Sequence, residues 1–164
     1  MKIYHGTDKS YDKFELIHAQ NYKDFGRGWY LADNFEFAAK NARKHGSLES
    51  YVMVYEINMV EIRELLRVKE FKKVSTNWIK FIIANRIKII EPTVDIVIGP
   101  TADSNAQELI ELFYRRFKNR TPSMKEYKEL IKRVMPNVYP RQFCFLTDRS
   151  IEYLNSKYVK TITL

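Results

Sequence analysis

Apolar residues recur along the chain with two spacings, which predict a mixture of strands and helices. Short runs rich in Val, Ile, Tyr and Phe indicate β-strands, expected at 1–4, 28–32, 51–57, 95–98, 142–146 and 158–164. Apolar positions that repeat every three to four residues indicate helices, expected at 34–45, 75–86, 104–118, 122–134 and 148–155. Residues 60–71 fit either a helical turn or a short strand.

Short polar residues in front of these helical periods predict where the helices begin. Ser, Thr, Asn and Asp accept hydrogen bonds from the free N–H groups of a first helical turn. The expected caps are Asp33 or Asn34, Ser75 or Thr76, Ser104, Thr121 followed by Pro122, and Asp148. Strands and helices do not alternate regularly, and the sequence contains no Gly-rich phosphate loop. The predicted fold class is therefore α+β, with a partly split antiparallel sheet.

Length and composition support one folded domain over residues 1–164. A chain of 164 residues can bury one sizeable core but is short for two. Its 45% hydrophobic and 14% aromatic residues are typical of globular proteins. Residues 8–27 lack periodicity and predict a long surface loop, and loops of this length in compact domains are often functional.

Positive charge is concentrated in one part of the chain. The formal net charge is +8, and the segment from Arg115 to Arg141 contains nine Lys or Arg and two Glu, which amounts to +7. Such a cluster attracts nucleic acid, an acidic protein or an anionic substrate. A lysine-rich, solvated helix face fits the same pattern, so charge alone identifies no partner.

Cysteine and histidine content narrows the chemistry. Cys144 is the single cysteine, which excludes an internal disulfide, and its two phenylalanine neighbours indicate a buried hydrophobe. The three histidines lack metal-ligand spacing, so no metal is expected, and His45 beside Gly46 fits a structural helix end. The sequence shows neither the apolar core of a signal peptide nor a run of membrane-spanning length. A cytoplasmic protein without a membrane partner is expected.

Three short segments carry the candidate functional residues. The segment Asp24–Asp33 reads DFGRGWYLAD, and glycines there permit backbone conformations that bring bare amides against a ligand. Tyr30 follows these glycines and offers an aromatic face. His5 stands at the end of the first strand, and Gln142 opens the strand at 142–146. Each of these residues also fits a structural role, and the hypothesis is that the three lie beside different strands of one cleft.

Taken together, these segments resemble the ADP-ribosyltransferase superfamily, in its His–Tyr–Glu branch typified by diphtheria toxin and the poly(ADP-ribose) polymerases. In that branch His-Gly-Ser/Thr ends one strand and Gly-x-Gly-x-Tyr opens another. The chain is still more similar to a bacterial family, domain of unknown function 3990, and it carries the segments of that family in order: Tyr4–Thr7, Asp24–Leu31, Trp78 with Asn85 and Arg86, Asp95–Asp103, and Gln142–Phe145.

The resemblance implies an ADP-ribosyltransferase-like split antiparallel sheet with flanking helices, and NAD as the substrate. His5 would hydrogen-bond a ribose hydroxyl of NAD, and the backbone of Gly6 would hold the nicotinamide carboxamide. Tyr30 would stack on the nicotinamide ring, and Arg27 would meet the pyrophosphate, whose paired oxygens suit a guanidinium. The implied NAD-binding residues are His5, Gly6, Thr7, Arg27, Gly28 and Tyr30.

By the same resemblance, His5, Tyr30 and Gln142 are the catalytic residues, and Gln142 stands where the branch has its glutamate. Breaking the bond between nicotinamide and ribose develops positive charge on the ribose, which a glutamate favours by its negative field. Glutamine keeps the hydrogen bond to the ribose 2′-hydroxyl and loses the field. Transfer would then be slow, assisted by a nearby carboxylate such as Asp103, or restricted to a target that supplies its own.

Two functions therefore compete. The first is an enzyme, a toxin or effector, that transfers ADP-ribose from NAD to a macromolecular acceptor, either protein or nucleic acid. Such a toxin would have a neutralising, antitoxin-like protein as a further partner. The second is a non-catalytic module of the same fold that binds NAD or nucleic acid. Gln142 in place of glutamate favours the second function, whereas His5 and Tyr30 favour the first.

Overall fold

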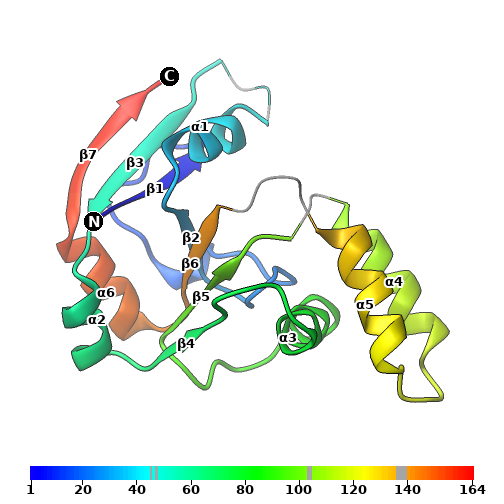
Figure 1. Cartoon of the computed structure of the whole chain (residues 1–164). Helices are drawn as coiled ribbons and strands as arrows, with labels where there is room; N and C mark the ends of the chain where they lie inside the picture. The colour runs from blue at the N-terminus through cyan, green and yellow to red at the C-terminus, as the bar shows by residue number, and fades with distance from the viewer. Residues whose placement is uncertain (45, 47, 103–104, 136–139) are drawn as a thin grey trace.

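The computed structural model describes residues 1–44, 46, 48–102, 105–135 and 140–164, which fold around one sheet (Figure 1). Its seven strands are β1 (Lys2–Thr7), β2 (Trp29–Ala32), β3 (Tyr51–Glu56), β4 (Val68–Glu70), β5 (Ile96–Pro100), β6 (Arg141–Phe145) and β7 (Tyr158–Thr163). They lie in the order β4-β5-β6-β2-β1-β3-β7, and all neighbours are antiparallel except β4 and β5. The fold class is α+β as predicted, but the sheet is mixed rather than wholly antiparallel.

The joint between β1 and β2, in the middle of the sheet, contains little backbone pairing. Its ladder has one registered pair, Tyr4 with Ala32, whereas β1 pairs with β3 over six residues. That long pairing carries β1 through Thr7, beyond the strand end predicted from the sequence. The sequence predicts a split sheet; the observed sheet is continuous in strand order, with this joint as a short ladder.

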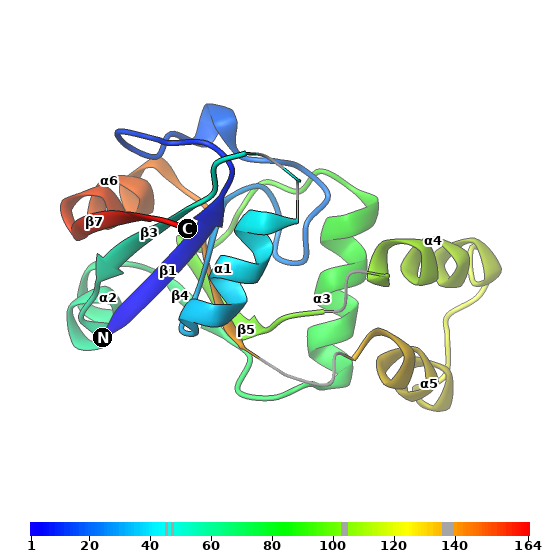
Figure 2. The same ribbon diagram turned by 90° about the horizontal axis from the view of Figure 1, so that it is seen from above.

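Helices cover both faces of the sheet. They are α1 (Phe35–Arg43), α2 (Met59–Leu65), α3 (Thr76–Ile87), α4 (Ala106–Arg116), α5 (Met124–Val134) and α6 (Asp148–Ser156), with a 3-10 turn at Leu16–His18. α1 and α3 pack on one face together with Phe25, and α2, α6 and the part of the loop between β1 and β2 around Phe14 pack on the other. α4 and α5 form a hairpin against α3, on the side away from the sheet (Figures 1 and 2). The ambiguous residues 60–71 become α2 followed by β4, so each alternative holds for part of that segment.

Alternating side chains of the central strands fill two apolar cores. On β6, Phe143 and Phe145 join a core with Phe14, while Cys144 joins a second core with Trp78 on α3. This follows from the pleat, which directs successive side chains to opposite faces. The strand at 142–146 has no polar alternation because both of its faces are covered by helices or loops.

Hydroxyl and amide side chains begin the helices, mostly where the sequence predicts. Asn34 and Ser75 are the N-caps of α1 and α3, which decides between the two pairs of expected caps. The expected start of α5 at Thr121 is wrong, because Ser123 is the cap and forms a capping box with Glu126.

The start of α6 differs from expectation, and the cap expected for α4 lies outside the described residues. Thr147 caps α6, so Asp148 is the first helical residue rather than the cap. The Thr147 and Ser150 side chains each accept a hydrogen bond from the other residue's backbone N–H, which explains why the cap lies one residue earlier than expected. Ser104, the expected cap of α4, lies outside the described residues, and α4 begins at Ala106.

Candidate functional site

Tyr30 on β2 holds the glycine-containing loop in place. Its hydroxyl accepts a hydrogen bond from the Phe25 N–H at 2.9 Å and donates one to the Gly26 carbonyl at 2.8 Å. Burial, together with the neighbouring Cys144, raises the pKa of Tyr30 well above its usual value, so the phenol stays neutral. The residue is half-buried, and its ring lies nearly parallel to that of Phe25, with the two centroids 6.3 Å apart.

His5 bonds to the backbone of the same tyrosine, but its ring lies on the other face of the sheet. Its Nδ1 lies 2.8 Å from the Tyr30 carbonyl oxygen, so Nδ1 carries the proton and donates. The ring packs edge-on against Phe14 and Trp29, with centroids 5.0 and 5.1 Å away. Burial lowers the pKa of His5, and the bond to Tyr30 opposes this effect. The imidazole is therefore neutral and links β1 to β2 where the ladder is short.

Gln142 lies on the same face of the sheet as Tyr30. In the register of β2 and β6, Tyr30 is opposite Cys144 and Ala32 is opposite Gln142, so the two side chains are diagonal neighbours. Gln142 is 8% exposed, and its Nε2 donates to Asp24 Oδ2 at 3.4 Å. This contact orients the amide, so Oε1 is the group that can accept a hydrogen bond from a ligand.

Asp24 is the centre of a buried polar cluster that the sequence did not reveal. Arg86 on α3 donates to its Oδ1 from Nε at 2.7 Å and lies 2.5 Å from the same oxygen through Nη2. The Ala102 N–H donates to Oδ2 at 3.1 Å, beside the Gln142 amide. Arg86 Nη1 also donates to Gln107 Oε1 at 3.2 Å. Four segments that are far apart in the sequence therefore meet at one carboxylate.

Structural reasons account for three glycines that the sequence assigns to ligand binding or to the loop beside it. Two of them are required by close packing and one by its backbone conformation. A Cβ on Gly6 would lie 1.8 Å from the Ala38 carbonyl oxygen, and one on Gly28 would lie 2.4 Å from the Phe145 carbonyl oxygen. Gly26 has a φ of +103°, which side-chain-bearing residues rarely adopt. These glycines let α1 and β6 approach the neighbouring backbone whether or not a ligand binds.

The remaining predicted ligand contacts are Thr7 and Arg27. Thr7 is buried, and its Oγ1 accepts from the Lys9 N–H at 3.0 Å, which stabilises the turn after β1. Arg27 is exposed and donates to the Leu16 carbonyl at 2.9 Å and to the Ala19 carbonyl at 3.4 Å. A guanidinium has five N–H donors, so Arg27 retains donors for an anion.

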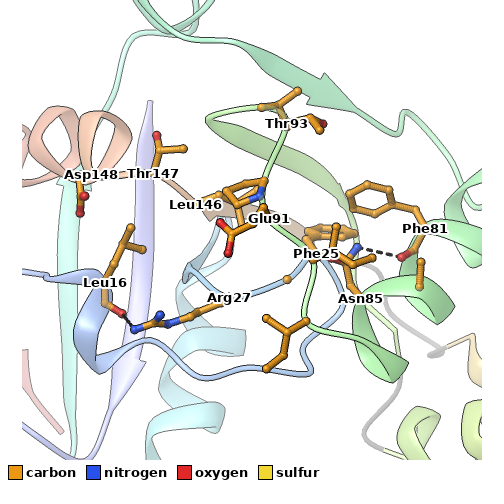
Figure 3. A pocket seen from close by; sticks show the side chains of 16 residues that line it. Leu16, Phe25, Arg27, Phe81, Asn85, Glu91, Thr93, Leu146, Thr147 and Asp148 are labelled. Atoms are coloured by element: carbon orange, nitrogen blue, oxygen red, sulfur yellow. Dashed lines mark hydrogen bonds between the residues drawn. The ribbon is translucent and has the colours of Figure 1, made fainter.

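A cavity of about 360 Å³ adjoins the glycine-containing loop (Figure 3). Its walls come from that loop, the end of α3, the segment at 89–94 and residues 146–148, and they include Arg27, Asn85 and Glu91. In Figure 3 the Arg27 side chain reaches toward the Leu16 carbonyl at the edge of this cavity. His5, Tyr30 and Gln142 do not line it, so the cavity borders the predicted cleft rather than coinciding with it.

Of the other candidate residues, Asp95 stabilises the fold, and two lie outside the described residues. Asp95 accepts hydrogen bonds from Arg67 and from Thr147 Oγ1, which ties β5 to the start of α6. Burial alone would raise the pKa of Asp95, but these hydrogen bonds lower it to about 2. Asp103 and His45 lie outside the described residues.

Two other kinds of feature, a metal-binding cluster and a membrane-spanning helix, are absent from the described ranges. Residues 1–44, 46, 48–102, 105–135 and 140–164 contain no group of three His, Cys, Asp or Glu side chains able to hold a metal ion. Across the same part of the chain, no helix has both the length and the apolar character needed to cross a bilayer.

The fold and this cluster define an α+β domain in which a buried carboxylate joins the sheet to α3. A family model described as protein of unknown function (DUF3990) matches residues 1–156, and the chain belongs to this family. No curated protein and no solved structure gives a significant match.

Proposed function

We propose that this protein is an NAD-dependent ADP-ribosyltransferase that modifies a macromolecular target as a toxin or effector. The observation that carries the proposal is the placement of Tyr30 and Gln142 on one face of the adjacent strands β2 and β6. Diagonal neighbours of this kind lie about 7–8 Å apart, and their Cβ atoms are somewhat closer. A nicotinamide ring stacked on Tyr30 would then bring its ribose within reach of the Gln142 amide.

In the proposed reaction, the bond between nicotinamide and C1′ of the ribose breaks, and nicotinamide leaves with the bonding electrons. A nucleophilic oxygen or nitrogen of the acceptor then bonds to C1′ and loses its proton to solvent water. Gln142 Oε1 would accept the ribose 2′-hydroxyl hydrogen, because its Nε2 is held by Asp24. The hydrogen bond would orient the sugar while positive charge develops on it.

His5 has a different role in this proposal from the one implied by the family resemblance. Its Nδ1 is bonded to the Tyr30 carbonyl, and its ring lies among Phe14 and Trp29 on the opposite face. We therefore assign His5 as a positioning residue that fixes the backbone of β2 relative to β1. Gly6 follows it on β1 and remains the proposed backbone partner of the carboxamide.

Arg27 and the neighbouring cavity would receive the rest of the dinucleotide. The cavity, about 360 Å³, falls in the size range of ligand pockets, which is about 300–1,000 Å³. Its wall includes Arg27, whose remaining N–H donors suit the pyrophosphate oxygens.

A non-catalytic NAD-binding module is the second candidate, and the charge of the cluster favours it. The Asp24 carboxylate is paired with Arg86, and Gln142 is uncharged. The described cluster therefore supplies no net negative field to stabilise a positively charged ribose. This alternative predicts NAD binding without release of nicotinamide.

The proposal is tested by label transfer from biotinylated NAD to macromolecules of a cell lysate. Transfer should be lost in Gln142→Ala and Tyr30→Ala, because the first removes the ribose contact and the second the stacking face. Tyr30→Phe should retain NAD affinity if its melting temperature is preserved, since it keeps the ring and loses the hydroxyl bonds to Phe25 and Gly26.

The matched control is Gln107→Ala. This substitution on α4 also removes an amide of the polar cluster, one that is bonded to Arg86 rather than to Asp24. Label transfer that survives Gln142→Ala as well as Gln107→Ala would contradict the assignment of Gln142. Saturable NAD binding with no label in any protein or nucleic-acid fraction would reject the transferase and support the module.

A further inference from the structure

The α4–α5 hairpin is rooted next to the candidate site. Antiparallel pairing of β5 and β6 places Gly99 opposite Gln142 and Pro100 opposite Arg141. The chain therefore leaves the sheet beside Gln142, forms the hairpin, and returns to the same place. Figures 1 and 2 both show the hairpin projecting beyond α3 from the body of the molecule.

Aromatic packing makes the hairpin a defined structure. The ring centroids of Phe113 and Phe117 are 4.6 Å apart, and those of Phe113 and Tyr127 are 5.5 Å apart. The second contact joins α4 to α5. Leu130 and Val134 are buried in the core shared with α3. The orientation of α5 is thus set, with one face directed inward.

Arginine side chains at the tip of the hairpin are already bound to other residues of the hairpin. Arg120 donates to both carboxylate oxygens of Glu126, which also accepts from the Ser123 N–H. The Arg120 bonds, together with those from Ser123, lower the pKa of Glu126 to about 2, although burial opposes them. Arg116 and Arg120 lie over the Phe117 ring, at 5.2 and 4.4 Å from its centroid. These cations shape the tip.

Lysines on α5 form a separate, outward stripe, defined here as Lys125, Lys128 and Lys132. Their spacing places them on the helix face opposite Leu130 and Val134, and all three are exposed. The stripe extends about 10 Å along the helix, at a rise of 1.5 Å per residue. Among the described residues, Lys125 and Lys128 have no ion-pair partner, and Lys132 pairs with Glu129 in an exposed, weak contact.

We propose that the α4–α5 hairpin binds the phosphate backbone of nucleic acid through this lysine stripe. Lysine is depleted where proteins bind one another, whereas Lys and Arg side chains neutralise the phosphates of bound nucleic acid. The stripe is charged and the apolar face of α5 is already buried against α4 and α3, which favours a polyanion over a protein surface.

The position of the hairpin gives this binding a consequence for the site. Gln107 on α4 is bonded to Arg86, which also holds Asp24 beside Gln142. Nucleic acid held along the hairpin would lie near the site, which makes it the candidate acceptor. That assignment rests on the proposed transferase function, while the binding itself does not.

The test measures binding without NAD, by fluorescence anisotropy of short labelled single-stranded DNA, RNA and duplex DNA. The hairpin variant is K125Q/K128Q/K132Q. The control is K2Q/K40Q/K160Q, which removes the same charge from exposed positions on β1, α1 and β7. The hairpin variant should bind about ten- to a hundredfold more weakly at about 100 mM salt, and its salt slope should fall by about 2–3. The control should change affinity far less.

Three results would overturn the proposal. The first is no binding of any nucleic acid at about 50 mM salt. The second is an equal loss in the hairpin variant and the control, which would show that net charge acts without a defined surface. The third is displacement by polyglutamate as effective as displacement by unlabelled nucleic acid, which would point to an acidic protein. Because NAD is absent, each result is independent of the proposed enzymatic activity.

Discussion

Replacing Arg86 by Met should destabilise the protein by several kcal/mol. The side chains of Arg86 and Asp24 are 12% and 7% exposed, so the substitution leaves a buried carboxylate without its cation. Removing one partner of a buried ion pair costs about 3–5 kcal/mol. Met and Arg have similar helix propensities, so α3 itself should not be the cause. For a chain of this size the loss corresponds to a melting temperature lower by about 6–20 °C.

Urea unfolding followed by circular dichroism measures this effect against a matched substitution. Arg115→Met removes an exposed arginine, 76% exposed and 3.9 Å from Glu111, and should cost less than about 1 kcal/mol. Adding Asp24→Asn to Arg86→Met neutralises the buried charge and should recover part of the loss. Equal unfolding midpoints for Arg86→Met and Arg115→Met would refute the reasoning, because burial would then confer no extra stability on the pair.

Three further substitutions or treatments test other contacts. Gly6→Ala should reduce the free energy of unfolding by about 1–3 kcal/mol or more, and lower the melting temperature, because the new Cβ would overlap the Ala38 carbonyl. An unchanged melting temperature would show that α1 can move away. Asp95 has a pKa of about 2, below its ordinary 3.8, so it stabilises the fold above about pH 4 and loses this effect toward pH 2. Asp95→Asn should therefore be less stable than the wild type at pH 7, by about 2 kcal/mol in the free energy of unfolding, and should melt at a lower temperature. The two melting temperatures should converge near pH 2. Cys144 is fully buried and its thiol pKa is raised by burial, so Ellman's reagent should react with it in urea and not in the native protein.

Local patterns predicted most of the elements because their causes are local. The run at 142–146 is apolar on both faces and forms β6, and Trp78 and Ile82 recur at helical spacing and face the core from α3. The start of α5 was mispredicted because Thr121 and Ser123 both offer a hydroxyl. Ser123 is the cap because the carboxylate of Glu126 completes the reciprocal pair of hydrogen bonds.

The candidate site was only partly predictable, since its contacts depend on tertiary structure. Asp24 and Arg86 lie 62 residues apart, and no spacing rule connects them. Likewise, the sequence places His5 beside a glycine but cannot show that its ring lies opposite Tyr30, because this depends on the register of β1 and β2. Gly6 was assigned to ligand binding, although contact with α1 already requires a glycine there.

Release of nicotinamide from NAD by the purified protein is the most direct test of the proposed site. It should be measured with the protein alone and with added nucleic acid or lysate, beside Tyr30→Ala and Gln142→Ala variants whose folding has been verified. We expect the wild-type protein to release nicotinamide, the acceptor to stimulate this release, and both variants to lose it. Absence of release with every acceptor, or release that persists in both variants, would contradict the account.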